Sequence, residues 1–143
     1  MKKLKYLIDT NICIYWLRDR NDIDKQIDAV GFEHCAISEI TMAELKIGSI
    51  LGRKIGLKDR HALDELFSKV KIIPISDAID LFAEEKVRLR LAGTPMDDNF
   101  DLLIGCTAVV NNLIMVTENT KDFKNIKGIK LENWIDSKKK SSK

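Results

Sequence analysis

The sequence has few cysteines, few histidines and no long apolar run, and each shortage argues against a class of protein. Its three cysteines, Cys13, Cys35 and Cys106, form no CxxC pair, so neither a zinc knuckle nor a disulfide framework is indicated. We expect them to be small buried side chains. Of the two histidines, His34 and His61, one would have to stand beside suitable partners to form a metal site or a Ser-His-Asp triad. No apolar run approaches the length of a membrane-spanning helix.

Size and charge describe an ordinary globular domain. The 143 residues are 45% hydrophobic and 32% charged, with a net charge of +2, which suits one domain with a hydrophobic core. The apolar run after the basic N-terminus stops at Asp9, too early for a secretory signal, and this favours a cytoplasmic protein. Residues 137–143 hold four lysines and no acid. We expect them to be a disordered lysine-rich tail behind a domain of residues 1–136.

Apolar segments with strand and helix periodicity alternate along the chain. We expect strands at 4–8, 35–38, 71–75, 113–117 and 129–132, and helices at 10–18, 22–30, 39–51, 58–70, 77–91 and 99–112. In helix 77–91 the predicted buried residues are Ile79, Phe82, Ala83, Val87 and Leu91. Strands alternating with helices predict an α/β protein whose mostly parallel sheet is covered on both faces.

Polar side chains follow the predicted strands at the ends where α/β proteins bind ligands. Asp9 comes directly after the first strand, Glu44 lies soon after the second, and Asn119 follows strand 113–117. Asp98 and Asp101 stand at the start of helix 99–112, and no lysine or arginine is adjacent to Asp101. Oxygen ligands alone favour Mg²⁺, with Mn²⁺ as a substitute, so one shared cation would satisfy the group.

Helix capping offers each acid a structural explanation instead. Asp9 and Asp98 stand at N-cap positions, Thr41 and Glu44 have the spacing of a capping box, and Asp101 lies in a first helical turn. Taken singly, each of these explanations is the better one. Four coincident caps are less plausible than one shared cation, and we therefore favour the metal site.

Four segments resemble, in order, the motifs of PIN-domain nucleases. They are Leu7-Ile8-Asp9-Thr10-Asn11, then residues 38–45, then residues 101–105 after Gly93-Thr94-Pro95, and last Val116-Thr117-Glu118-Asn119. Their order and spacing are most similar to the VapC-type toxins of bacterial toxin–antitoxin pairs. The resemblance extends over residues 4–135, nearly the whole chain.

This resemblance implies a PIN-like three-layer α/β/α fold with a central parallel sheet of about five strands. It also implies a Mg²⁺-dependent endoribonuclease that hydrolyses phosphodiester bonds in RNA such as tRNA, that is inhibited by a cognate antitoxin protein, and that pairs as a homodimer. Asp9, Glu44 and Asp101 match the three acidic metal-site positions of the family, Asn119 matches the fourth catalytic position, and Asp98 matches a position that is often acidic.

Candidate RNA contacts come from the resemblance and from a basic cluster. Thr10 and Thr117 match small hydroxyl positions near the metal. Arg53, Lys54 and Lys58 lie in one short segment and would contact phosphates outside the acidic pocket. A solvated helix end is the alternative explanation of this cluster.

Three other functions compete with this one. A haloacid-dehalogenase-type phosphatase needs a second Asp two residues after the first, where this chain has Asn11. A response-regulator receiver needs paired acids and a late lysine, for which Lys121 is a poor candidate. A catalytically silent PIN-like module that binds RNA or a partner is the third, and titration with Mg²⁺ would distinguish it.

Overall fold

The computed structural model describes residues 3–52 and 60–135, and its centre is a five-stranded parallel sheet. The strands are β1 (Tyr6–Ile8), β2 (Cys35–Ser38), β3 (Lys71–Ile73), β4 (Ile114–Val116) and β5 (Lys130–Glu132), in the order β3-β2-β1-β4-β5. Every strand pairing is parallel, so all carboxyl ends lie at one edge of the sheet. The predicted α/β class and parallel sheet of about five strands are confirmed.

Helices connect the strands in sequence order. The longer ones are α1 (Thr10–Leu17), α2 (Ile23–Val30), α3 (Glu39–Leu51), α4 (Arg60–Lys69), α5 (Ile79–Leu91) and α6 (Asn99–Val110). Shorter turns are η1 (Phe32–His34), η3 (Ser76–Ala78) and α7 (Thr120–Phe123), the last of which the sequence did not predict. None of the helices in the described part of the chain is long and apolar enough to cross a membrane.

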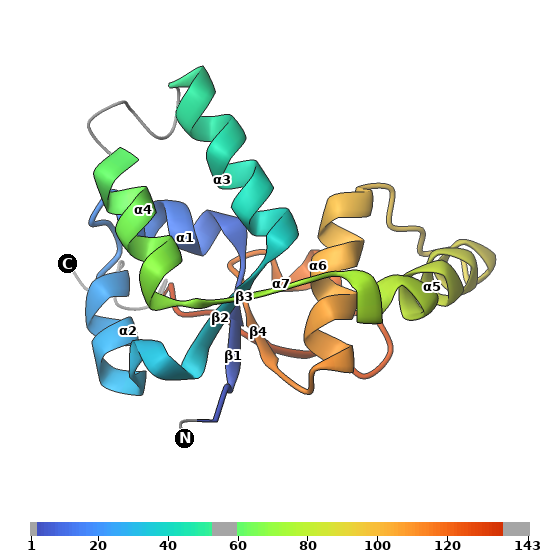
Figure 1. Ribbon diagram of the computed structural model, residues 1–143. Coiled ribbons are helices and arrows are strands. Elements are labelled where there is room, and N and C mark those ends of the chain that lie inside the picture. Colours follow the sequence, from blue (N-terminus) through green and yellow to red (C-terminus); the bar gives the residue numbers. More distant parts are fainter. Residues whose placement is uncertain (1–2, 53–59, 136–143) are drawn as a thin grey trace.

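The helices cover both faces of the sheet, which gives three layers (Figure 1). α1, α2 and α4 pack on one face, and α5 and α6 pack on the other. Alternate side chains of β1 serve both cores: Tyr6 and Ile8 join the first, whereas Leu7 joins the second. The three cysteines are free and buried, as predicted.

The buried face of α5 differs from the predicted one. Of the five residues expected to face inward, only Phe82 packs against the core, and Val87 and Leu91 are 56% and 82% exposed. The buried positions of the helix are Glu85 and Leu89. The prediction was wrong because it assigned all charged residues to solvent, whereas Glu85 is buried with an ion-pair partner on its own helix.

Close packing joins α6 to the segment after α7. A Cβ added at Gly105 would lie 2.5 Å from Cδ1 of Ile126 and 3.5 Å from the ring of Phe123. Only glycine fits without a shift of these buried side chains. The loop after β4 is thereby held beside α6, whose first turn holds two of the predicted acids.

Candidate active site

The predicted site residues converge on one pocket at the carboxyl edge of the sheet. A cavity of about 400 Å³ is lined by Asp9, Glu44, Asp98, Asp101 and Asn119, among others. They come from the ends of β1 and β4, from α3 and from the start of α6. Residues far apart in sequence meet here because parallel strands end at the same edge.

Asp9 lies at the bottom of this arrangement and is only 4% exposed. Its Oδ1 accepts a hydrogen bond from the Thr10 amide at 2.8 Å, which makes it the N-cap of α1. Its Oδ2 accepts a hydrogen bond from the Thr117 hydroxyl, also at 2.8 Å. Burial raises the pKa of Asp9, and the two hydrogen bonds act against this shift. Asp9 is therefore both a helix cap and a fixed member of the pocket.

Thr117 is completely buried and connects two members of the pocket. Its hydroxyl donates to Asp9 and accepts a hydrogen bond from the Asn119 amide at 3.1 Å. The RNA contact predicted for Thr117 does not fit this burial, because the side chain has no surface to offer. Its hydroxyl instead sets the position of Asp9 relative to the loop that contains Asn119.

Glu44 is fixed by a neighbour from another helix. Thr10 Oγ1 donates to Glu44 Oε1 at 2.6 Å and lies 3.0 Å from Thr41 Oγ1. The N-cap of α3 is Ser38, whose Oγ accepts from the Ile40 amide. Thr41 therefore lies inside the helix, and the capping box considered for Thr41 and Glu44 is wrong.

Asp98 and Asp101 stand together at the start of α6. Asp98 is the N-cap, and its Oδ1 accepts from the Asp101 amide at 3.1 Å. Burial raises the pKa of Asp101 to about 7, and the negative charges of Asp98, Asp9 and Glu44 contribute to the same shift. Asp101 is thus a carboxylate whose neighbours add negative charge instead of compensating it.

The lining fits a hard divalent cation. Its candidate ligands are carboxylate and amide oxygens, and no lysine or arginine lines the pocket among the described residues. As the side chains lie, no three Asp, Glu, His or Cys residues within 3–52 and 60–135 are arranged to hold one ion by themselves. An ion bound here would keep water in part of its coordination shell, as Mg²⁺ usually does.

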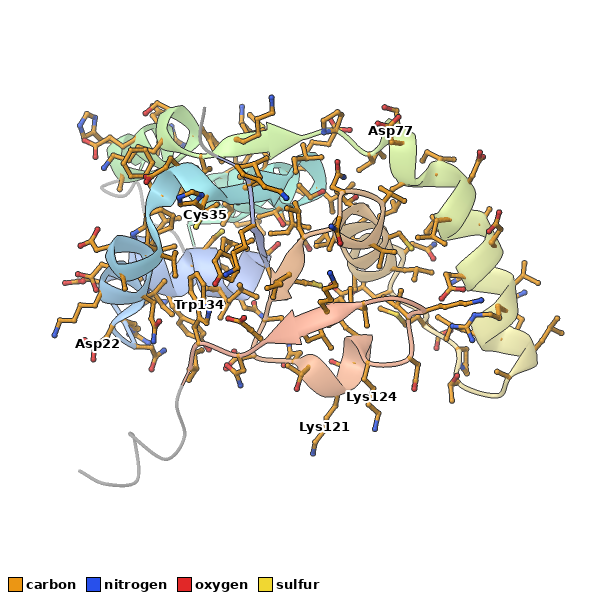
Figure 2. All side chains as sticks on the ribbon, turned by 90° about the horizontal axis from the view of Figure 1, so that it is seen from below. Asp22, Cys35, Asp77, Lys121, Lys124 and Trp134 are labelled. Carbon is orange, nitrogen blue, oxygen red and sulfur yellow. The ribbon has the colours of Figure 1, made fainter. Side chains whose placement is uncertain are left out.

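A second pocket, of about 350 Å³, lies on the other side of the same acids. It shares Asp98 and Asp101 with the first pocket and extends to Lys121, Asp122 and Asn125. Lys121 and Lys124 project outward from the α7 region (Figure 2). The sequence pattern did not predict this second pocket.

Sequence reasoning also missed a contact beside Asn119. The Tyr15 hydroxyl on α1 donates to Glu118 Oε1 at 2.6 Å, and this hydrogen bond raises the pKa of Tyr15. The charge of Glu118 also contributes to the raised pKa of Asp9. Tyr15 and Glu118 are 103 positions apart, and neither residue belongs to a local pattern that would have linked them.

Several predicted features lie outside the described residues. Arg53, Lys54 and Lys58 fall within 53–59, and the tail after residue 136 falls within 136–143. The phosphate contacts predicted for the basic cluster, the domain limit and the disorder of the tail remain predictions.

Comparisons with known proteins agree on one family. The family model of the PIN domain matches residues 6–129 of the sequence. Ribonuclease VapC2 of Rickettsia felis is 33% identical over 132 residues, which cover 90% of this chain and 97% of that protein. The tRNA(fMet)-specific endonuclease VapC of Shigella flexneri is 28% identical, with 92% and 98% covered. The crystal structure of VapBC2 from Rickettsia felis, bound to a DNA fragment from its promoter, matches with a TM-score of 0.79 at 31% identity and covers 92% of this chain and 99% of that one.

Proposed function

This chain belongs to the PIN domain family, and from that premise we propose that it is a VapC-type toxin, an endoribonuclease that hydrolyses phosphodiester bonds in RNA. The observation that carries the proposal is the pocket in which Asp9, Glu44, Asp98, Asp101 and Asn119 meet without a basic side chain among the described residues. Similarity to a ribonuclease and to an endonuclease over nine-tenths of the chain supports the same reaction.

The reaction depends on a metal ion, and Mg²⁺ is the ion that the donor set favours, with Mn²⁺ as a substitute. Asp9, Asp101 and Glu44 would hold it, with Asp98 at the exposed rim. When bound, the ion supplies a water of lowered pKa and positive charge for the developing negative charge at phosphorus. The excess of carboxylates around Asp101 supports this assignment.

The catalytic work of the chain is divided among residues of the pocket. Glu44 orients the attacking water and accepts its proton, while Thr10 fixes the carboxylate of Glu44 through a hydrogen bond of 2.6 Å. The side-chain amide of Asn119 completes the polar lining of the pocket. Attack on phosphorus would leave a 5′-phosphate and a 3′-hydroxyl.

Partners follow from the same premise. The neighbour from Rickettsia felis is a VapBC2 complex, which supports a cognate antitoxin protein as the partner of this chain. The relative from Shigella flexneri acts on tRNA(fMet) according to its name, which makes tRNA the first substrate to test. We further propose a homodimer in the cytoplasm.

Cleavage of tRNA by the purified protein, with Mg²⁺ or with EDTA, tests the function. We expect cleavage only with Mg²⁺, and we expect Asp9→Asn and Glu44→Gln to lower its rate by about a thousandfold or more, because each removes several kcal/mol of transition-state stabilisation. Asp77→Asn, an exposed acid of η3 (Figure 2), is the matched control and should keep full activity. Cleavage by Asp9→Asn at the wild-type rate would overturn the assignment. RNA binding without Mg²⁺-dependent cleavage by the wild type would favour the silent module.

A further inference from the structure

An exposed aromatic ring stands at the edge of the acidic pocket. Phe100 precedes Asp101 in the first turn of α6, and both residues line the cavity. The ring is 44% exposed, although several residues further along the same helix, among them Leu102, Ile104 and Cys106, are completely buried. Phe100 therefore presents apolar surface to the pocket instead of packing in the core.

The lining of the pocket combines two kinds of side chain. Asp9, Glu44 and Asp101 are acidic, whereas Phe100, Ile14 and Ile47 are apolar. Without a cation, the acidic side chains repel a phosphate group. The apolar side chains suit an uncharged, flat group, and a volume of about 400 Å³ is within the usual range for small-ligand sites.

We propose that Phe100 is a base-stacking residue, which holds an unpaired nucleobase next to the phosphate that is cleaved. This proposal rests on the proposed function and adds how the substrate is positioned. Proteins that bind single-stranded RNA stack bases on aromatic side chains, because every base has a flat face irrespective of sequence. A pocket of this kind selects RNA segments whose bases are not held in a duplex, such as loops.

The chain offers a matched control for this residue. Phe32 in η1 is 45% exposed, almost the same as Phe100. η1 directly precedes β2, and the pocket lies where the parallel strands end, so Phe32 stands at the opposite edge of the sheet. Leucine at either position removes a ring and keeps an apolar side chain, so any general effect on folding should be similar in both variants.

The first measurement is steady-state cleavage of a single-stranded RNA with saturating Mg²⁺. We expect Phe100→Leu to raise KM by about tenfold with kcat nearly unchanged, since a stacked base contributes equally to substrate and transition-state binding. Phe100→Tyr retains a ring and should restore the wild-type KM, and Phe32→Leu should leave KM unchanged. Equal KM values for Phe100→Leu and Phe32→Leu would overturn the proposal.

The second measurement reports stacking without cleavage. In the Glu44→Gln background, an RNA with one fluorescent adenine analogue in a loop should lose fluorescence on binding, and Phe100→Leu should abolish this loss. RNA binding with unchanged quenching in Phe100→Leu rejects the stacking role and leaves the nuclease function intact. Failure of the wild type to cleave RNA rejects the function itself. A Phe100→Leu variant that loses only antitoxin binding would show that a protein, and not a base, covers the ring.

Discussion

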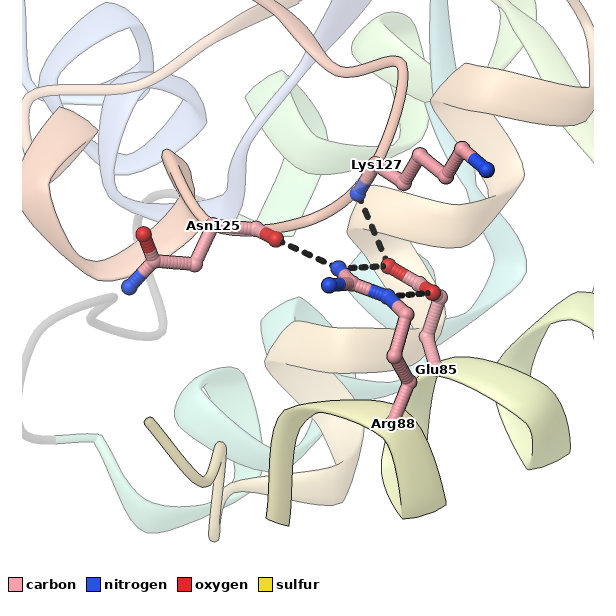
Figure 3. A network of polar contacts seen from close by, with 4 residues as sticks. All are labelled: Glu85, Arg88, Asn125 and Lys127. Atoms are coloured by element: carbon pink, nitrogen blue, oxygen red, sulfur yellow. Dashed lines mark hydrogen bonds and ion pairs between the residues drawn. The ribbon is translucent and has the colours of Figure 1, made fainter. Parts of the chain in front are cut away.

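The carboxylate of Glu85 and the carboxylates of the pocket have opposite electrostatic surroundings. Glu85 accepts hydrogen bonds from Arg88 Nε at 2.6 Å, from a terminal nitrogen of Arg88 at 2.7 Å and from the Lys127 amide at 2.8 Å (Figure 3). These contacts, the Arg88 hydrogen bonds foremost, hold the pKa of Glu85 below its usual range. Asp101 in the pocket has carboxylates as neighbours, and burial together with their charges raises its pKa to about 7.

The difference distinguishes an acid that stabilises the fold from the pocket acids, which we propose bind a cation. Arg88 also donates to the Asn125 carbonyl at 2.8 Å, so the Glu85 cluster ties α5 to the loop after α7. Every fully buried side-chain polar atom in the described residues has a hydrogen-bond partner, and the buried pocket acid Asp9 accepts hydrogen bonds from Thr10 and Thr117. What the pocket lacks among its described lining residues is positive charge, which an external cation would supply.

Loss of the Glu85 charge should produce the largest change in stability. In Glu85→Gln an amide NH₂ replaces one of the oxygens that accept from Arg88 and Lys127, so a buried donor faces another donor. We expect the free energy of unfolding to fall by about 1–3 kcal/mol and the melting temperature to drop by several degrees. Urea and thermal unfolding measure this effect.

The neighbouring exposed acid provides the control for that change. Glu84→Gln removes the same charge from the same helix at an exposed position and should change stability by less than about 0.5 kcal/mol. Cleavage per folded molecule should be unaffected in both variants, because Glu85 acts on the fold. Equal stability of the two variants would mean that the cluster in Figure 3 contributes nothing.

Removal of a pocket acid should raise the free energy of unfolding, the opposite of the effect expected for Glu85→Gln. The pKa of Asp101 is raised in the folded protein from 3.8 to about 7, so its favourable contribution to stability is lost as pH rises through that value. In EDTA at about pH 8, Asp101→Asn should therefore be more stable than the wild type by about 1–2 kcal/mol, after allowance for solvent screening. Thermal unfolding across the pH range measures the difference.

The stability changes caused by Asp101→Asn and Glu85→Gln should both depend on pH. The gain from Asp101→Asn should shrink as pH falls from about 7 toward about 4, because the wild-type carboxyl then takes up a proton. The loss from Glu85→Gln should also shrink in acid, because a lowered pKa gives stability that is present above the ordinary value of 4.5 and is lost as pH falls through the folded value. A pocket variant that is less stable than the wild type at pH 8 would contradict this account of the site.

Local sequence signals were sufficient for much of this architecture. β2 and α3 have the predicted bounds, 35–38 and 39–51, because Ser38 caps the helix and Gly52, with φ of 69°, ends it. The convergence of Asp9 and Glu44 also followed from their places after parallel strands, and Asp101 joins them from the first turn of α6. Capping and pocket membership turned out to be compatible at Asp9 and Asp98, which the sequence had presented as alternatives.

Contacts between distant residues were beyond the reach of the sequence. Beside Arg88 on its own helix, buried Glu85 has a second partner in the Lys127 amide, 42 positions away, and hydrophobic periodicity gives no sign of this second contact. The partnership of Tyr15 and Glu118 depends on how α1 lies against the loop after β4. In both cases the polar group is stabilised by a partner that tertiary structure supplies, and a pattern based on one segment cannot include that partner.

Loss of the Tyr15–Glu118 hydrogen bond should give the smallest change in stability of the variants considered, apart from the controls. Glu118 has a partner, but a single neutral hydroxyl at 2.6 Å, and both side chains are partly exposed, so water can replace the bond. We expect Tyr15→Phe to lower the free energy of unfolding by about 0.5–1 kcal/mol and to leave cleavage within about threefold of the wild type.

A double-mutant cycle with Glu118→Gln isolates the contribution of the charge, since the amide oxygen can still accept the hydrogen bond. A coupling energy near zero would mean that the charge of Glu118 adds nothing to the hydrogen bond with Tyr15. A large loss of cleavage in Tyr15→Phe would assign Glu118 to the pocket acids. Loss of its hydrogen bond should lower the cleavage rate only if Glu118 itself takes part in the reaction.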